Sequence, residues 1–331
     1  MPRDIAIDLG TSSLQIFERN SGLVFNEPSV LALDDSTGKV IDLGFAALPF
    51  IGHSAGSVRL QRPIRHGTIT DFAMAVKLVS AAFKRIGVSR LSRARILVLS
   101  SAVASSVERR AMMDVAREAG ASRAEVIEQS LAGAIGLDLP IQDPTGSVVV
   151  SLGAGTTEAA MISLGGVVSR EAIRIGGEDI NTAIALALRS GAGLVVGDRS
   201  AEEIKRSLPQ LLEDPTRTLE VIGREGIHGE PASVVISGAQ IEVAIAEIRR
   251  SIVQVVTKAL ALAPPELAQD AIDGGIHLFG GAAQLHGIGE MIATATEVSV
   301  VEYPEPELTS ITGAGNCLAS LSSLKAIFEH P

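Results

Sequence analysis

The sequence has almost none of the residues that build covalent or metal cross-links. Its 331 residues include a single cysteine, Cys317, which excludes an intramolecular disulfide and a cysteine-based zinc site. Histidines are also few and lack metal-ligand spacing; they stand at His53, His66, His228, His277, His286 and His330. A lone thiol is typical of a reducing compartment, so we expect a cytoplasmic protein without redox chemistry.

Long apolar runs are missing as well. Although 46% of the residues are hydrophobic and the mean hydropathy is +0.33, no stretch approaches the roughly 20 apolar residues that span a bilayer. The first strand-like run starts close to Met1, so we expect no signal peptide. The hydrophobic content predicts two filled cores instead.

Positive charge is in deficit. The chain has 28 basic and 38 acidic residues, which gives a formal net charge of −10. This balance argues against the phosphate backbone of a nucleic acid as the main partner. We therefore expect no nucleic-acid binding.

What the chain does contain is an alternation of short β-rich runs with helical periodicities, which is typical of an α/β protein with mixed sheets. Strands are predicted at Ile5–Ile7, Leu14–Phe17, Ser29–Leu33, Ile96–Leu99, Val148–Val150, Ala159–Ser163, Ser233–Ile236 and Ile276–Leu278. Helices are predicted at Asp71–Arg85, Ser106–Ala119, Ile180–Arg189 and Gln240–Leu262. Less regular segments at about 34–66 and 190–237 predict a small lobe inserted in each of two cores. The turn-forming cluster at residues 143–146 marks the boundary between the cores.

The most informative pattern is a strand–turn motif that occurs twice. Ile5-Ala6-Ile7-Asp8-Leu9-Gly10-Thr11-Ser12 is repeated in form by Val148-Val149-Val150-Ser151-Leu152-Gly153-Ala154-Gly155-Thr156-Thr157-Glu158. Glycine and hydroxyl residues after a buried strand let backbone N–H groups approach an anion. Two such turns in one chain predict a phosphate held between two domains. The copies differ in one respect, because Ser151 stands where the first copy has Asp8.

Two further segments support a nucleotide site. Leu278-Phe279-Gly280-Gly281-Ala282-Ala283 places glycines after a strand, where a base or ribose can approach the backbone. Glu202 and Lys205, three residues apart on one helix face, can reach ribose hydroxyls and the base. Taken alone, that pair is better explained as a surface ion pair.

Together these elements resemble the actin/Hsp70/sugar-kinase ATPase fold, and within it the MreB and MreB-like bacterial actins. The resemblance covers nearly the whole chain. It is carried by Asp8–Thr11, Asn26–Val30, Arg62–Ile64, Gly67–Phe72, Val107–Ala111, Ala132–Gly136, Gly153–Glu158, Ile162–Leu164, Arg174–Gly177, Ala201–Lys205 and Pro264–Ala268. It implies a ribonuclease H-like fold with residues 1–144 and 310–331 in domain I, residues 145–309 in domain II, and a nucleotide cleft between them.

The resemblance also implies the ligands, ATP and Mg²⁺, and a role for each site residue. The β- and γ-phosphate contacts are expected at Gly10, Thr11, Ser12, Gly153, Gly155, Thr156 and Thr157. Asp8 is expected near Mg²⁺ through water. Gly280 and Gly281 are expected beside the adenosine, and Glu202 with Lys205 at the ribose or base.

The sequence departs from the family pattern where hydrolysis would occur. Ser151 replaces an aspartate that helps arrange the metal-bound water, and a hydroxyl cannot place a fixed negative charge there. Gln129 stands at the position of a water-activating glutamate; an amide can orient water but is no general base. With Thr156 as the second water-positioning residue, we expect ATP binding with slow or absent hydrolysis. Glu158 is the alternative compensating acid.

The resemblance implies surfaces too. Head-to-tail self-association would form protofilaments, and the 106–119 helix, with Val107 and Met113, would pair them laterally. The 87–95 loop, with Val88, Leu91 and three arginines, is the candidate membrane contact. Cell-wall synthesis proteins are the expected partners.

The sequence is also compatible with other functions. A regulatory pseudo-actin that binds nucleotide without polymerising fits the altered turn. A small-molecule kinase of the same fold fits less well, because no base aspartate aimed at a substrate hydroxyl is evident. An Hsp70-type ATPase domain is a further alternative.

Overall fold

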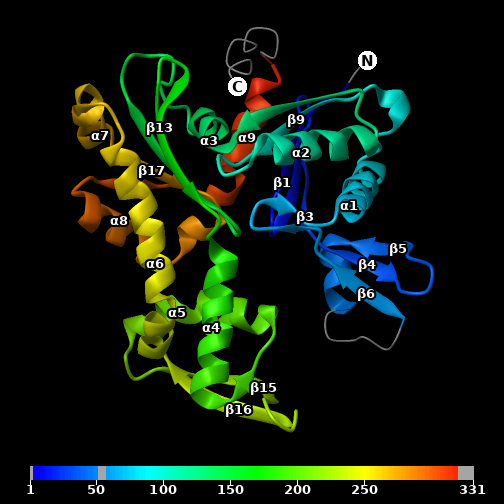
Figure 1. The fold of residues 1–331 in the computed structure, drawn as a ribbon, viewed down its shortest axis with the longest axis vertical. Coiled ribbons are helices and arrows are strands. Elements are labelled where there is room, and N and C mark those ends of the chain that lie inside the picture. Colours follow the sequence, from blue (N-terminus) through cyan, green and yellow to red (C-terminus); the bar gives the residue numbers. More distant parts are fainter. Residues whose placement is uncertain (1–2, 51–56, 320–331) are drawn as a thin grey trace.

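The computed structural model describes residues 3–50 and 57–319. Two five-stranded sheets stand side by side, each covered by helices (Figure 1). The first has the strand order β10-β9-β1-β2-β3 and the second the order β13-β12-β11-β17-β18. In each, a central strand pairs antiparallel with the next strand of the chain and parallel with a later one. The prediction of two similar α/β domains with mixed sheets is confirmed.

The first domain is built on the first sheet. Its sheet strands are β1 (Asp4–Leu9), β2 (Ser13–Glu18), β3 (Gly22–Pro28), β9 (Arg95–Ser100) and β10 (Arg123–Glu128). Its helices are α1 (Phe72–Arg85), α2 (Ser106–Glu118) and α3 (Gln129–Gly136). A two-stranded hairpin, β7 (Ile64–Arg65) with β8 (Thr68–Ile69), precedes α1.

The second domain repeats this plan. Its sheet strands are β11 (Ser147–Leu152), β12 (Thr157–Ser163), β13 (Gly166–Ile173), β17 (Ile276–Phe279) and β18 (Val300–Glu302). Its helices are α4 (Gly177–Ala192), α6 (Gly238–Ala261), α7 (Ala268–Gly274) and α8 (Ile288–Thr296). Every residue of β11 and of β12 is buried. Helices cover both faces of such a sheet, which explains the unbroken apolar run at Val148–Val150.

A smaller sheet accompanies each large one (Figure 1). The first consists of β4 (Leu31–Asp34), β5 (Val40–Leu43) and β6 (Val58–Gln61). The second consists of β14 (Leu194–Val195), β15 (Thr218–Glu225) and β16 (Pro231–Ser237), joined through α5 (Asp198–Glu213). In Figure 1 both lie below the large sheets, at the same end of the molecule.

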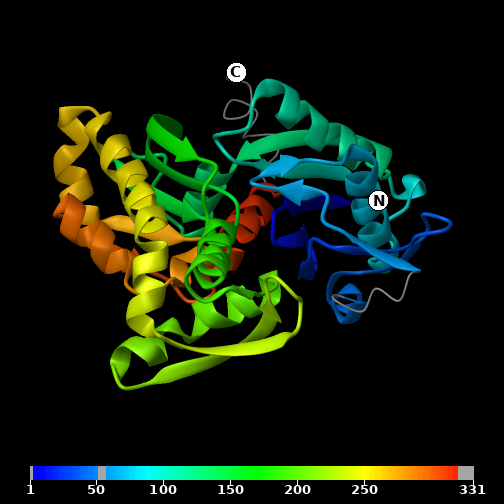
Figure 2. The same ribbon diagram turned by 60° about the horizontal axis from the view of Figure 1, so that its bottom comes forward.

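A last helix, α9 (Thr309–Cys317), connects the domains. It follows the second domain in sequence but packs against α3, β1 and β2, and it lies between the domains in both views (Figure 2). Its partner α3 is rich in small residues; a Cβ added at Gly133 would collide with the ring of Phe279. The seam between the domains is thus a close-packed apolar layer.

None of the helices in the described ranges is both long enough and apolar enough to cross a bilayer.

Candidate functional site

The first phosphate-type turn joins β1 to β2 and is anchored by its neighbours. The Ser29 hydroxyl donates to the Gly10 carbonyl oxygen at 2.7 Å. The Thr11 hydroxyl oxygen accepts from the Gly67 backbone N–H at 2.9 Å, and Thr11 is buried. Ser12 is exposed. The turn therefore has a fixed backbone and presents one free hydroxyl residue.

The second turn faces the first. Its backbone closes on itself where the Gly153 N–H donates to the Thr156 carbonyl at 2.9 Å. A Cβ placed on Gly155 would lie 2.5 Å from Thr11 Oγ1 and 2.6 Å from the Cα of His66. Because only glycine fits at that distance, the two turns approach each other more closely than side chains would allow. The structure brings the two predicted motifs together.

The start of α4 links the second turn to the other predicted elements. The Gly177 N–H donates to the Gly153 carbonyl at 3.0 Å, and the Lys205 ammonium donates to the Gly177 carbonyl at 3.2 Å. A Cβ on Gly177 would lie 3.4 Å from both the Ala282 Cβ and the Lys205 Nζ. Gly280, with φ of 96°, has a backbone conformation that favours glycine. The glycine segment after β17 and Lys205 thus border the second turn.

Glu202 and Lys205 form the ion pair that their spacing predicts, at 2.6 Å. The Glu202 carboxylate also accepts from Arg206 at 2.8 Å and from Asn181 at 2.9 Å. Burial alone would raise the pKa of Glu202, but Lys205, Arg206 and Asn181 together lower it to about 2. The two side chains form a structural ion pair and also place charged groups beside the second turn.

Asp8 is the acid of the first turn. It is partly buried, and burial raises the pKa of its carboxyl to about 7. Within residues 3–50 and 57–319, no basic side chain lies at ion-pair distance from it. A carboxylate that lacks a protein counter-charge suits a hydrated divalent cation, which prefers oxygen ligands and would favour the ionised form.

The acid predicted to compensate in the second turn is engaged elsewhere. Ser151 is buried with 2% exposure and lies directly opposite Glu158 in the β11–β12 register. The buried Glu158 carboxylate accepts from the Ser101 hydroxyl at 2.8 Å and the Ala102 N–H at 2.7 Å, both in the first domain. Burial raises the pKa of Glu158. Glu158 therefore ties the two domains together.

Two more predicted hydroxyl and amide residues have defined places. The Thr157 hydroxyl is fully buried and donates to the Ile175 carbonyl at 2.7 Å, so that hydroxyl anchors the turn. Gln129 is partly buried and begins α3 at the end of β10. The adjacent Glu128 carboxylate pairs with Arg170 at 2.7 Å and with Arg109 at 3.2 Å. These ion pairs occupy the carboxylate, so Glu128 does not replace Gln129 as a water-activating acid.

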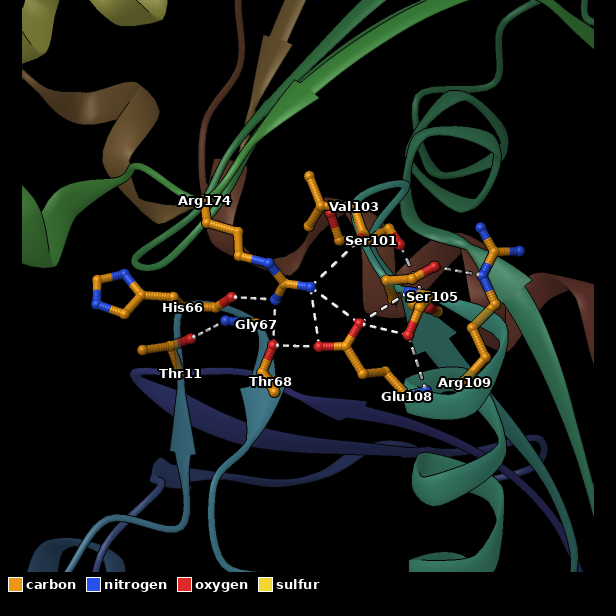
Figure 3. A network of polar contacts seen from close by, with 12 residues as sticks. Thr11, His66, Gly67, Thr68, Ser101, Val103, Ser105, Glu108, Arg109 and Arg174 are labelled. Atoms are coloured by element: carbon orange, nitrogen blue, oxygen red, sulfur yellow. Dashed lines mark hydrogen bonds and ion pairs between the residues drawn. The ribbon is translucent and has the colours of Figure 1, made fainter.

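A network across the domains has no predicted counterpart (Figure 3). Arg174, which follows β13, donates to Glu108 at 2.8 and 2.9 Å. Glu108 is the third residue of α2 and forms a capping box with Ser105. The Ser-x-x-Glu pattern was readable in the sequence as a helix start, but its contact with Arg174 was not.

The predicted surfaces are partly corrected. On α2, Val107 is 75% exposed, whereas Met113 packs against the core. In the 87–95 loop, Leu91 is 93% exposed, but Val88 is buried and cannot contact a membrane. Arg95 is committed to an ion pair with Asp4 at 2.6 Å. The candidate membrane contact is thereby reduced to the tip of the loop.

Two α/β domains joined by packed helices, with glycine turns facing each other across the seam, define an actin-like protein. Solved structures agree. MreB5 of Spiroplasma citri bound to ADP superposes with a TM-score of 0.89 at 27% identity, covering 98% of each chain. The MamK double helical filament gives a TM-score of 0.74 over 97% of this chain and 99% of that one; at 18% identity it supports the fold alone.

Sequence comparison narrows the class. The family model for the MreB/Mbl protein matches residues 2–326. The cell shape-determining protein MreB of Escherichia coli K12 is 36% identical over 322 residues, which cover 95% of this chain and 93% of that protein. The cell shape-determining protein Mbl of Bacillus subtilis 168 is 32% identical over 324 residues, 97% of each. The chain belongs to the MreB/Mbl family.

Proposed function

We propose that this protein binds ATP with Mg²⁺ between its two domains and assembles head to tail into filaments that organise cell shape. The observation that carries the proposal is the approach of Gly155 to Thr11, which brings one glycine-containing turn from each domain together, where backbone N–H groups of both turns would hold the phosphates. MreB5 of Spiroplasma citri, with the same fold, has been solved with ADP and with AMPPNP.

In this proposal the residues divide the nucleotide between them. The phosphates are held by backbone N–H groups of the two turns and by the Thr11, Ser12 and Thr156 hydroxyls. Lys205 and Glu202 hold the ribose or base, and Gly280 with Gly281 lets the adenosine approach the chain. We assign residues 1–144 and 310–331 to one domain and 145–309 to the other; positions 1–2, 51–56 and 320–331 lie outside the described residues.

Magnesium fits the first turn. Asp8 would hold it through water, and the ion would supply charge neutralisation of the phosphates. Ser151, in the corresponding place of the second turn, offers a neutral hydroxyl that contributes no charge to the ion.

Slow or absent hydrolysis follows from the same residues. Gln129 and Thr156 can orient a water but cannot take its proton. The Glu128 carboxylate pairs with two arginines and is not free to serve as a base. The buried Glu158 has one oxygen bonded to Ser101 and Ala102, and among the described residues its Oε1 has no partner, so Glu158 is the one acid here that could still compensate. ATP would then act as a structural ligand that favours one relative orientation of the domains.

The filament and its partners complete the proposal. We expect lateral pairing of protofilaments through the exposed Val107 side of α2 and membrane contact through Leu91. The names of the relatives, cell shape-determining proteins, support a role in cell shape, and we propose cell-wall synthesis proteins as the partners.

The test combines three measurements on the purified protein: binding of a fluorescent ATP analogue, phosphate release, and electron microscopy with and without Mg-ATP. Filaments that form with Mg-ATP and release phosphate far more slowly than ordinary bacterial actins support the proposal. Binding with monomers under all conditions favours the regulatory pseudo-actin. Rapid release removes the claim of impaired hydrolysis, and absence of binding overturns the whole.

A further inference from the structure

Arg174 forms an ion pair across the domains and donates several further hydrogen bonds to the first domain. From the second domain its guanidinium reaches four residues of the first (Figure 3). It donates to both Glu108 oxygens at 2.8 and 2.9 Å, to the Val103 carbonyl at 3.1 Å, to the His66 carbonyl at 3.1 Å, and to the Thr68 hydroxyl. The planar fork of arginine suits such a set, because its donors have fixed directions.

Glu108 holds Arg174 and caps α2 with the same carboxylate. Its Oε2 accepts from the Ser105 N–H and hydroxyl at 2.8 Å each, and its Oε1 accepts from the Thr68 hydroxyl at 2.8 Å. The Ser105 backbone bond, followed by the bonds from Thr68 and Ser105 and the charge of Arg174, lowers the pKa of Glu108 to about 2. Glu108 is therefore ionised at neutral pH, and the first turn of α2 is tied to the second domain.

On its other side, Arg174 is close in sequence to residues that contact the second phosphate turn. Only two residues further on, a Cβ on Gly176 would lie 2.5 Å from the Gly153 carbonyl oxygen and 2.6 Å from that of Ala154. The Gly177 N–H donates to the Gly153 carbonyl, and the Glu178 N–H donates to the Ala154 carbonyl at 2.8 Å. A shift of the turn must therefore move the backbone that carries Arg174.

We propose that Arg174 is a positioning residue that couples the second phosphate turn to the first turn of α2, so that occupation of the nucleotide site orders the exposed start of that helix. The coupling rests on the proposed nucleotide binding. It gives α2, where Val107 is 75% and the Arg110 side chain 80% exposed, a surface that responds to the ligand.

Arg170, an arginine within β13, provides the matched control. Arg170 also crosses to the first domain, where it pairs with Glu128 at 2.7 Å. It lies four residues further than Arg174 from Gly176, where the proposed path meets the turn, and it does not touch the α2 capping box. Arg170→Ala therefore removes one cross-domain ion pair without interrupting the proposed path.

The experiment measures hydrogen exchange of the α2 amides and dissociation of a fluorescent ATP analogue for wild type, Arg174→Ala, Arg174→Lys, Glu108→Gln and Arg170→Ala. In wild type, Mg-ATP should slow exchange at Ser106–Arg110. Arg174→Ala should abolish this response and speed dissociation by about tenfold, a typical coupling strength. Arg174→Lys should recover part of it, because an ammonium keeps the charge but not the fork. Glu108→Gln should resemble Arg174→Ala.

Each other outcome is decisive. A wild type that binds no analogue overturns the proposed function and the coupling together. A wild type that binds without slowed exchange in α2 overturns the coupling alone, as does an Arg174→Ala variant that keeps the wild-type response. If Arg170→Ala changes α2 exchange and analogue dissociation as much as Arg174→Ala does, the effect comes from weakened contact between the domains in general. The specific path through Arg174 is then wrong. Arg174→Lys keeps the test valid if the alanine variant is unfolded.

Discussion

The two phosphate-type turns share a plan and differ in charge. The β1–β2 turn carries Asp8, a partly buried acid with a pKa raised to about 7. The β11–β12 turn carries the buried Ser151. One carboxylate oxygen of the nearby Glu158 accepts hydrogen bonds from Ser101 and Ala102 of the other domain. Under the proposed function the first turn would meet a cation, whereas Glu158 beside the second turn bonds to the other domain. We therefore expect both copies of the motif to hold an anion and only the first to contribute an acid beside a cation.

The largest loss of ATP binding should come from a side chain that forces the two turns apart. Gly155→Val places a side chain where Thr11 Oγ1 and the His66 Cα already lie 2.5 and 2.6 Å from an ideal Cβ. We expect loss of detectable ATP binding, measured with a fluorescent analogue. Circular dichroism should show a folded protein. Undiminished affinity would contradict the placement of the phosphates between the turns.

Restoring the acid to the second turn should cost stability. Ser151→Asp buries a carboxylate at a site with 2% exposure, and without metal we expect a loss of about 3 kcal/mol in urea unfolding. Mg²⁺ with a nucleotide should recover part of it and increase phosphate release. Ser151→Asn, of the same size without charge, is the control. Equal losses of stability in both variants would mean that side-chain volume, and not charge, limits which residue can stand at position 151.

Removing the acid from the first turn should have the opposite sign. The folded-state pKa of Asp8, about 7, exceeds the ordinary value of 3.8, so ionisation favours the unfolded state as pH rises between these values. Because Asp8 is partly solvated, we expect Asp8→Asn to stabilise the nucleotide-free protein by roughly 2 kcal/mol at pH 8. It should also lose the Mg²⁺ dependence of ATP binding.

The pH profile makes this test specific. The gain should shrink as pH falls below about 7 and vanish near pH 4, where the carboxyl is protonated in both states. Urea unfolding at several pH values measures it. A gain that is constant with pH would show that the burial of Asp8 has no electrostatic cost.

The smallest effect calibrates the glycine argument. Gly191, within α4, has nothing within 4 Å of an added Cβ. Gly191→Ala should therefore stabilise the protein by about 0.5–1 kcal/mol and leave ATP affinity unchanged, because alanine loses less backbone entropy in a helix. Thermal unfolding measures this gain. A destabilised variant would call into question the contact geometry used for Gly155.

Much of the fold was readable from local pattern. Unbroken apolar runs at Ile5–Ile7 and Val148–Val150 predicted strands that the structure buries. The long periodic stretch before Pro264 predicted α6, which ends at Ala261. Prediction failed where the apolar pattern is irregular or the side chains are small. β13 shows mixed exposure and α3 is built from small residues without a clear apolar stripe, so neither has a strong periodic signal.

The candidate site divides in the same way. The glycine and hydroxyl residues of both turns were identified from their order in the chain. The fates of Val88 and Glu158 were not, because an apolar or acidic residue in a loop or strand carries no mark of what will cover it. The predicted start of α2 at Ser106 is confirmed, and Ser105, the residue before it, caps the helix by bonding Glu108.

The sequence by itself determined the α/β class, the doubled turn and the loss of its second acid, since each depends on residues adjacent in the chain. Tertiary structure alone decided that Gly155 meets Thr11, that Glu158 is committed to the domain seam, and that Arg174 reaches Glu108, 66 residues away. The physical reason is range. Strand and turn preferences act between neighbours, whereas burial and charge pairing depend on which distant segments the packed sheets bring into contact.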